Sequence, residues 1–170
     1  YLDKISQILL PSSRALYGER SYYCDNCGKI FRIRRNIADL ENHYWEPKCS
    51  KCHSKNLSST PTKEDCSPDP LSIYAITKLS QEQLVRQFSE SYKLPTTILR
   101  YFNVYGPGQS LINPYTGVLS TFYNRVSAKK ILNIFEDGLE TRDFIFIDDL
   151  VIASIKCLEI EKCKGKIINI

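Results

Sequence analysis

Two Cys-x-x-Cys pairs restrict the folding of this 170-residue chain more than any other feature of its sequence. Cys24 and Cys27 form the first pair, and Cys49 and Cys52 form the second, with 21 residues (28–48) between them. This spacer is slightly longer than the usual one of about 15–20 residues. Four thiolates suit tetrahedral Zn²⁺, and a site made only of cysteines is typically structural. We therefore predict a structural zinc ion bound by these four cysteines.

The stretch 19–67 around these pairs has the character of an insertion into another fold. It holds both histidines and the only tryptophan, has no sustained helical period and ends in Ser- and Pro-rich loop signals. His43 and His53 stay alternative ligands. The stretch is too short for a core of its own, so we expect a small zinc ribbon that is disordered without metal. Seven cysteines without a secretory signal indicate a reduced, cytoplasmic location.

Charge and hydropathy exclude two classes of partner. The chain carries 23 Lys and Arg against 19 Asp and Glu, a net charge of +4, and its basic residues are scattered. Arg32, Arg34 and Arg35 cluster within the ribbon, but nearby acidic residues offset them, so we expect no nucleic acid partner. No run of about 18 apolar residues occurs, so we expect no contact with a membrane.

Outside the ribbon, short apolar segments alternate with segments of helical period. The pattern predicts strands at 6–10, 96–100, 131–135, 143–147 and 166–170, and helices at 71–92, 116–128 and 148–159. Ser72 is the expected N-cap of the first helix, and 103–109 is expected to be a loop. Strands that alternate with helices predict an α/β fold with a parallel sheet.

Tyr74 and Lys78 are the strongest candidates for chemistry. They stand four residues apart in the first predicted helix, so they share one face. An ammonium beside a phenol favours the phenolate and makes it a usable general base. Ser13 follows a predicted strand, at the edge of a parallel sheet where ligands bind. A solvated polar pair on the helix, and ordinary turn chemistry for the serine, stay open as alternatives.

Four motifs occur in an order that resembles the extended short-chain dehydrogenase/reductase family, specifically its NAD-dependent nucleotide-sugar epimerases and dehydratases. They are Ser-Ser-Arg-Ala-Leu-Tyr-Gly-Glu, Tyr-Ala-Ile-Thr-Lys, Leu-Arg-Tyr-Phe-Asn-Val-Tyr-Gly-Pro and Arg-Asp-Phe-Ile-Phe-Ile-Asp-Asp, at 12–19, 74–78, 99–107 and 142–149. The ribbon insertion, together with Ile-Asn-Pro-Tyr-Thr-Gly-Val at 112–118, is similar to the dTDP-L-rhamnose 4-epimerase-like branch. The resemblance implies a Rossmann-type sheet, NAD as cofactor and a homodimer.

The resemblance also implies the catalytic and cofactor-binding roles. Ser13 would hydrogen-bond the reacting hydroxyl, and Tyr74 would be the acid/base. Lys78 would bind the nicotinamide ribose and tune Tyr74. Tyr101 would approach the nicotinamide side of the cofactor.

Three further residues are expected, again by resemblance, at the nucleoside-diphosphate sugar. Asn103 and Arg142 would hold its diphosphate, and a guanidinium fork does suit phosphate oxygens. Tyr115 would line the substrate pocket. A surface ion pair of Arg142 with Glu140 or Asp143 stays the alternative.

One departure from the family pattern narrows the reaction. Dehydratases of this family carry an Asp-Glu pair directly after the catalytic Ser or Thr, where this chain has Arg14 and Ala15. We therefore expect epimerisation at C4 of a sugar of the dTDP-L-rhamnose/dTDP-L-talose type, through a 4-keto intermediate. UDP-glucose 4-epimerisation, or another nucleotide-sugar oxidoreduction, is the alternative within the family. A non-catalytic zinc-ribbon interaction module is the alternative from another class.

The family's Gly-rich cofactor turn is absent from this sequence, which also lacks methionine. We therefore expect the middle of a protein of about 300 residues, the size that a cofactor domain and a substrate lobe require. Residues 1–18 and 68–112 would be the C-terminal half of the Rossmann-type domain, 19–67 the ribbon and 113–170 a partial substrate-binding region. We expect the chain alone to be inactive.

Overall fold

A parallel sheet forms the centre of the chain, for which a computed structural model describes residues 4–110 and 117–170. Its strands are β1 (Ile8–Ser13), β5 (Thr96–Tyr101) and β8 (Ile167–Asn169), in the order β1-β5-β8. Both pairings are parallel. Every residue of β5 from 96 to 100 is buried, as expected for a strand with neighbours on both sides. The parallel α/β fold predicted from the sequence is confirmed.

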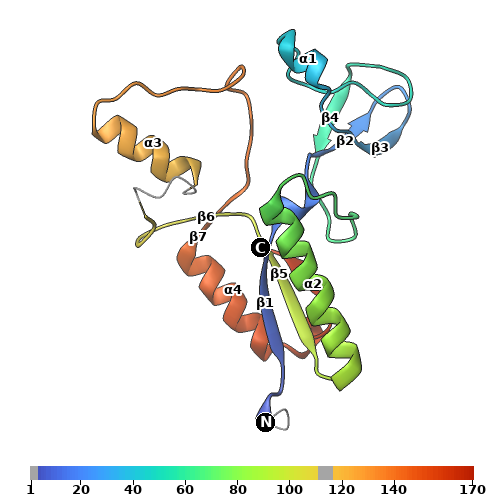
Figure 1. Cartoon of the computed structure of the whole chain (residues 1–170), viewed down its shortest axis with the longest axis vertical. Coiled ribbons are helices and arrows are strands. Elements are labelled where there is room, and N and C mark those ends of the chain that lie inside the picture. The colour runs from blue at the N-terminus through green and yellow to red at the C-terminus, as the bar shows by residue number, and fades with distance from the viewer. Residues whose placement is uncertain (1–3, 111–116) are drawn as a thin grey trace.

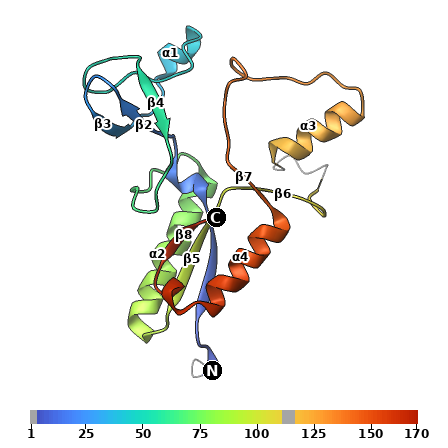
Figure 2. The ribbon, with the colours of Figure 1, turned by 180° about the vertical axis from the view of Figure 1, so that it is seen from behind.

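Two helices cover the sheet, α2 (Ile73–Tyr92) and α4 (Ile147–Glu159) (Figures 1 and 2). The Ser72 hydroxyl accepts a hydrogen bond from the Ala75 amide, which confirms Ser72 as the N-cap of α2. Along β5, Arg100 bonds to Glu82 of α2, whereas the next residue, Tyr101, bonds to Ser154 of α4. Successive side chains of a strand point to opposite faces, so α2 and α4 lie on opposite faces of the sheet.

A buried polar network fixes α2 against the sheet. Arg100 donates to both carboxylate oxygens of Glu82, at 3.0 and 2.8 Å, and both side chains are 3% exposed. Ser12 of β1 donates to the same carboxylate at 2.5 Å. Arg100 also donates to the hydroxyl of Tyr17, which in turn donates to Asn169 of β8. The network therefore joins all three strands of the sheet to one position on α2.

The inserted segment folds as a separate antiparallel sheet beyond the carboxyl ends of the parallel strands (Figure 1). It consists of β2 (Ser21–Cys24), β3 (Lys29–Arg32) and β4 (Leu57–Thr60), in the order β3-β2-β4. A short helix, α1 (Ile37–Glu41), lies between β3 and β4 in the chain. The 3-10 helix η2 (Arg14–Tyr17) connects the end of β1 to the root of this ribbon.

The structure differs from the secondary structure predicted from the sequence in two segments, 103–105 and 131–135. Within the expected loop, β6 (Asn103–Tyr105) pairs in parallel with β7 (Phe144–Phe146), a partner about 40 residues away that local sequence does not reveal. The strand predicted at 131–135 is wrong, because Ile131 and Phe135 are more than 80% exposed and the segment has no strand partner among the described residues.

The C-terminal part returns to the central sheet. Two further elements, α3 (Val118–Ser127) and the 3-10 helix η3 (Glu161–Cys163), accompany β7, α4 and β8. Since β8 pairs with β5, the expected boundary at 112/113 separates residues that share one sheet. No described helix is both long and apolar enough to cross a bilayer.

Candidate functional site

The two serines at the end of β1 have different surroundings. Ser12 is 4% exposed and its hydroxyl is engaged by Glu82. Ser13 is half-buried and caps η2, where its Oγ accepts a hydrogen bond from the Ala15 amide at 3.1 Å. A hydroxyl that accepts one bond keeps its own proton available to a further acceptor. Of the two serines, Ser13 is therefore the one whose hydroxyl is able to donate to a ligand.

Tyr74 and Lys78 lie together on α2, on the turns next to the end of β1. The Lys78 Nζ donates to the Pro11 carbonyl of β1 at 3.0 Å and lies 6.0 Å from the centre of the Tyr74 ring. Tyr74 is 53% exposed, so its phenol is open to a ligand. Among the described residues no hydrogen bond joins Ser13 to Tyr74. Such bonds in catalytic sites often tighten only when substrate is bound.

Tyr101 and Asn103 end the neighbouring strand. Tyr101 is the register partner of Ser13, and its hydroxyl lies 3.1 Å from the Ser154 hydroxyl of α4. The Asn103 side chain donates to the Asp143 carbonyl at 2.8 Å, which connects β6 to the residue before β7. Tyr101 and Ser13 thus end adjacent parallel strands, the place where α/β sheets bind ligands.

An open cavity of about 830 Å³ lies between η2, the root of the ribbon and the segment 136–143. Asn103 and Arg142 line it, as does Ser72, the N-cap of α2. Tyr74, Lys78, Ser13 and Tyr101 are not among its lining residues. The predicted site residues therefore lie in two places. Asn103 and Arg142 line this cavity, whereas the other four lie near the carboxyl ends of β1 and β5. Tyr115 lies outside the described residues.

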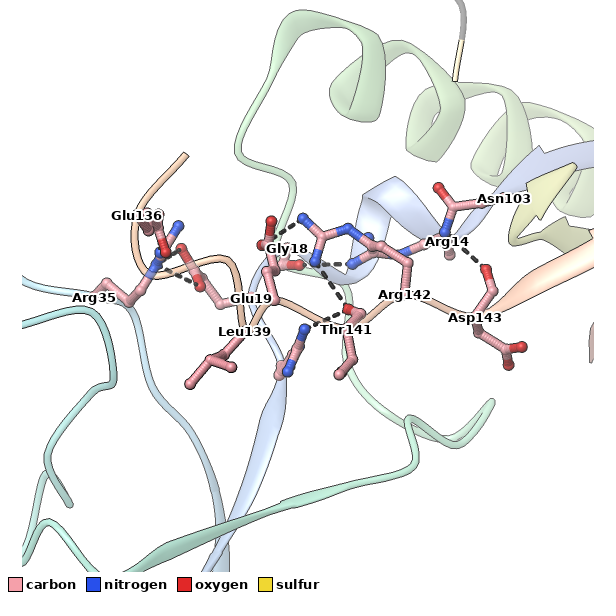
Figure 3. A network of polar contacts seen from close by, with 12 residues as sticks. Arg14, Gly18, Glu19, Arg35, Asn103, Glu136, Leu139, Thr141, Arg142 and Asp143 are labelled. Carbon is pink, nitrogen blue, oxygen red and sulfur yellow. Dashed lines mark hydrogen bonds and ion pairs between the residues drawn. The ribbon is translucent and has the colours of Figure 1, made fainter. Parts of the chain in front are cut away.

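Arg142 forms the ion pair that the sequence left open as its alternative. Its guanidinium donates to the Glu140 carboxylate and, at 3.0 Å, to the Thr141 carbonyl (Figure 3). Its side chain is 32% exposed, and such an exposed pair contributes about 0–1 kcal/mol. Because the pair is weak, it does not prevent Arg142 from binding an anion that enters the cavity.

Two arginines at this cavity were not among the residues predicted to bind substrate. Arg14 and Arg20 line it together with Arg142. Burial, followed by the charges of Arg142 and Arg20, lowers the pKa of Arg14. Arg14 lies within the family motif at 12–19, but the resemblance assigned it no ligand, and Arg20 lies just after that motif. Their convergence depends on how the ribbon folds back toward 136–143, which no local pattern reveals.

The four predicted cysteines form one cluster, in which all Sγ atoms lie within 4.8 Å of one another. The Sγ atoms of Cys24 and Cys52 are 3.6 Å apart, and those of Cys27 and Cys49 are 3.9 Å apart. Four sulfurs at about 2.3 Å from a tetrahedral zinc would be separated by about 3.8 Å. The donor set therefore fits zinc, and the described residues add neither histidine to the group.

Both Cys-x-x-Cys turns have the same backbone shape. The Gly28 amide donates to the Cys24 carbonyl at 2.8 Å, and the His53 amide donates to the Cys49 carbonyl at 2.9 Å. Gly28 and His53 have positive φ values of 61° and 56°. A left-handed residue directly after the second cysteine closes each turn, and His53 serves here as backbone rather than as a ligand.

Two of the thiols ionise differently. The neighbouring Cys52 thiol and burial raise the pKa of Cys27 to about 12. Burial also opposes ionisation of Cys49, but the amides of Cys52 and Lys51 outweigh it and lower the pKa of Cys49 to about 7. A metal ion bound by the four sulfurs would displace the thiol protons, because thiolates are the ligands that such a cation takes.

The chain is similar to known proteins of one described family. The family described as "NAD dependent epimerase/dehydratase family" matches residues 48–170. A dTDP-L-rhamnose 4-epimerase from Burkholderia thailandensis is 39% identical over 155 residues, 91% of this chain and 41% of that protein.

Solved structures of similar fold include UDP-glucuronic acid 4-epimerase from Bacillus cereus in complex with NAD. It has a TM-score of 0.70 and 30% identity, over 98% of this chain and 41% of that one. UDP-N-acetylglucosamine 4-epimerase from Methanobrevibacter ruminantium has a TM-score of 0.69 and 28% identity, over 99% and 42%. The chain thus spans less than half the length of these relatives.

Proposed function

Because the chain belongs to the NAD-dependent epimerase/dehydratase family, we propose that it supplies the proton-transfer and sugar-binding residues of a nucleoside-diphosphate-sugar 4-epimerase. The observation that carries this proposal is the Tyr74–Lys78 pair, in which the Lys78 ammonium donates a hydrogen bond to the Pro11 carbonyl of β1, two residues before Ser13. The three 4-epimerases that resemble this chain support it.

The residues present fit the nicotinamide end of NAD. Tyr101 ends β5, and Lys78 of α2 reaches the neighbouring strand β1 near its carboxyl end, where such cofactors bind. When bound, NAD supplies a reversible hydride acceptor for the C4 carbon of the sugar. Lys78 would hold the ribose by donating hydrogen bonds from its ammonium.

Tyr74 then moves the proton of the reaction. Its phenolate oxygen accepts the proton of the C4 hydroxyl while that carbon loses hydride, which leaves a 4-keto sugar. Ser13 donates a hydrogen bond to the oxygen on C4 and orients it. On the return step the Tyr74 hydroxyl would give the proton back to the C4 oxygen, once the sugar has turned its opposite face to the hydride that NAD would supply. The sugar then regains the proton and the hydride that it lost, so the reaction is redox-neutral overall.

For the substrate we propose a sugar of the dTDP-L-rhamnose/dTDP-L-talose type, supported by the relative from Burkholderia thailandensis. Arg14 and Ala15, at the positions of the acidic pair of dehydratases, argue against elimination of water. Asn103 and Arg142 would bind the diphosphate, and Tyr115 would contact the sugar. The homodimer stays a prediction from the resemblance, and the cytoplasmic location stays a prediction from the cysteine usage.

The test is product analysis with the full-length protein, NAD and either dTDP-L-rhamnose or UDP-glucose. We expect the C4 epimer of the first, detected by NMR of the sugar protons. Conversion of UDP-glucose but not of dTDP-L-rhamnose would instead indicate a UDP-glucose 4-epimerase, the alternative within the family. Absence of turnover with both sugars, in zinc-loaded protein, would favour a non-catalytic zinc-ribbon module.

Replacement of Tyr74 by Phe tests the assignment of the acid/base. We expect kcat to fall by about 100- to 10,000-fold, the usual contribution of a positioned acid/base, with an unchanged circular dichroism spectrum. Tyr92→Phe, at an exposed tyrosine at the other end of α2, is the matched control and should keep full turnover. Near wild-type turnover of Tyr74→Phe would refute the assignment.

A further inference from the structure

The ribbon reaches the cavity through its root. Arg20 lies between η2 and β2, and its guanidinium donates to the Thr141 carbonyl, 121 residues away in the chain. Arg142 donates to the same carbonyl oxygen at 3.0 Å. Two guanidinium groups from distant parts of the chain therefore meet at one atom, on the wall of the 830 Å³ cavity.

Arg14 adds a third positive charge at this place. It extends from η2, where its guanidinium donates to the Gly18 carbonyl at 3.2 Å. Within the described residues, Arg14 and Arg20 have main-chain carbonyls as hydrogen-bond partners, and neither forms an ion pair with a carboxylate. Like charges held close together raise the free energy of the cluster, and an anion would relieve this repulsion.

Six carboxylates line the cavity, and three of them, Glu19, Glu136 and Glu140, are paired with arginines. Arg35 of the ribbon pairs with Glu19 at 3.3 Å and with Glu136 at 2.6 Å, and Glu140 pairs with Arg142 (Figure 3). The Arg35 bridge also ties the segment 136–143 to the ribbon. Arg35 of the ribbon therefore neutralises Glu19 and Glu136 and holds the segment 136–143 against the root of the ribbon.

We propose that the ribbon forms one wall of the substrate site, where Arg14 and Arg20 bind the diphosphate of the nucleotide sugar together with Arg142. This inference rests on the proposed function for the identity of the ligand. Planar guanidinium groups bind phosphate oxygens in pairs, and a diphosphate offers enough acceptors for three of them. The half-buried position of Arg14 and Arg20 lowers the effective dielectric constant and so strengthens their attraction to the ligand.

Calorimetric titration of the full-length protein with inorganic pyrophosphate, and separately with dTDP, tests the proposal. We expect Arg14→Gln and Arg20→Gln each to weaken binding of both ligands about tenfold, since each removes a charge-assisted hydrogen bond. Arg86→Gln, at an exposed arginine of α2 that does not line the cavity, removes the same charge and should leave both affinities unchanged.

Zinc content and thermal melting of each variant monitor folding. If Arg20→Gln fails to fold, Arg14→Gln still tests the cluster, because Arg14 lies before the ribbon in the chain. Arg20→Lys keeps the charge and should recover part of the affinity.

Unchanged affinities in folded Arg14→Gln, or equal losses in Arg86→Gln, would overturn the proposal. If the binding losses appear but neither sugar is epimerised, the proposed function fails and the anion site stands. If epimerisation proceeds with unaltered KM in Arg14→Gln and Arg20→Gln, the anion site fails and the function stands.

Discussion

Neighbouring residues on one strand of this fold serve different tasks, because a strand alternates its side chains between two faces. Ser12 and Arg100 point to α2 and join the buried network, whereas Tyr101 contacts α4 and Ser13, the last residue of β1, caps η2. Sequence patterns identified the serine pair and the Tyr74–Lys78 pair. They could not identify Glu82 as the partner of Ser12 and Arg100, because it lies on a helix whose hydrophobic period gives no sign of a buried carboxylate.

The buried ion pair leads to a prediction about stability. Replacing Glu82 with Ala leaves the Arg100 guanidinium buried without its carboxylate, so the free energy of unfolding should fall by about 3–5 kcal/mol. Urea denaturation monitored by circular dichroism measures it. Glu90→Ala, at an exposed glutamate of the same helix, should change the free energy by less than about 0.5 kcal/mol. A similar small effect for Glu82→Ala would show that the network does not hold α2 in place.

Among the elements, those with a local signal were the predictable ones. The α2 helix follows from its N-cap and its period, and β5 follows from a β-branched apolar run. Both Cys-x-x-Cys turns follow from cysteine spacing. The pairing of β6 with β7 depends on a distant partner. The apolar run at 131–135 remains exposed, because an apolar segment becomes a strand only where a neighbouring strand or a buried face receives it.

We expect the folding of the ribbon to depend on a bound zinc ion. We expect about one zinc per chain by mass spectrometry of the native protein. Chelation should remove amide-exchange protection from β2, β3 and β4 while β1 and β5 keep theirs, because binding to such a site provides most of the folding free energy of a small ribbon. Cys27→Ser should have the same effect as chelation. Cys66→Ser, outside the cluster, should not. Protection of the ribbon that survives full removal of zinc would contradict a structural metal.

At the scale of the whole molecule, each helix covers a face of the sheet and still leaves apolar surface uncovered. Four residues of α4 form an exposed stripe, each between 47% and 51% exposed: Val151, Ile152, Ile155 and Leu158. On α2, Ile73 and Ile76 are exposed as well. β1 is at the edge of the described sheet, so one side of its backbone has no strand partner there.

The last prediction concerns the binding of NAD by the 170 residues alone. In the proposed site Lys78 and Tyr101 would bind the nicotinamide end of NAD, but the sequence contains no Gly-rich turn to receive the pyrophosphate, which contributes much of the affinity for a dinucleotide. We therefore expect no measurable NAD binding by calorimetry of this chain. The Bacillus cereus UDP-glucuronic acid 4-epimerase, solved with NAD, is the positive control. Micromolar binding by the 170 residues would mean that another part of this chain holds the pyrophosphate.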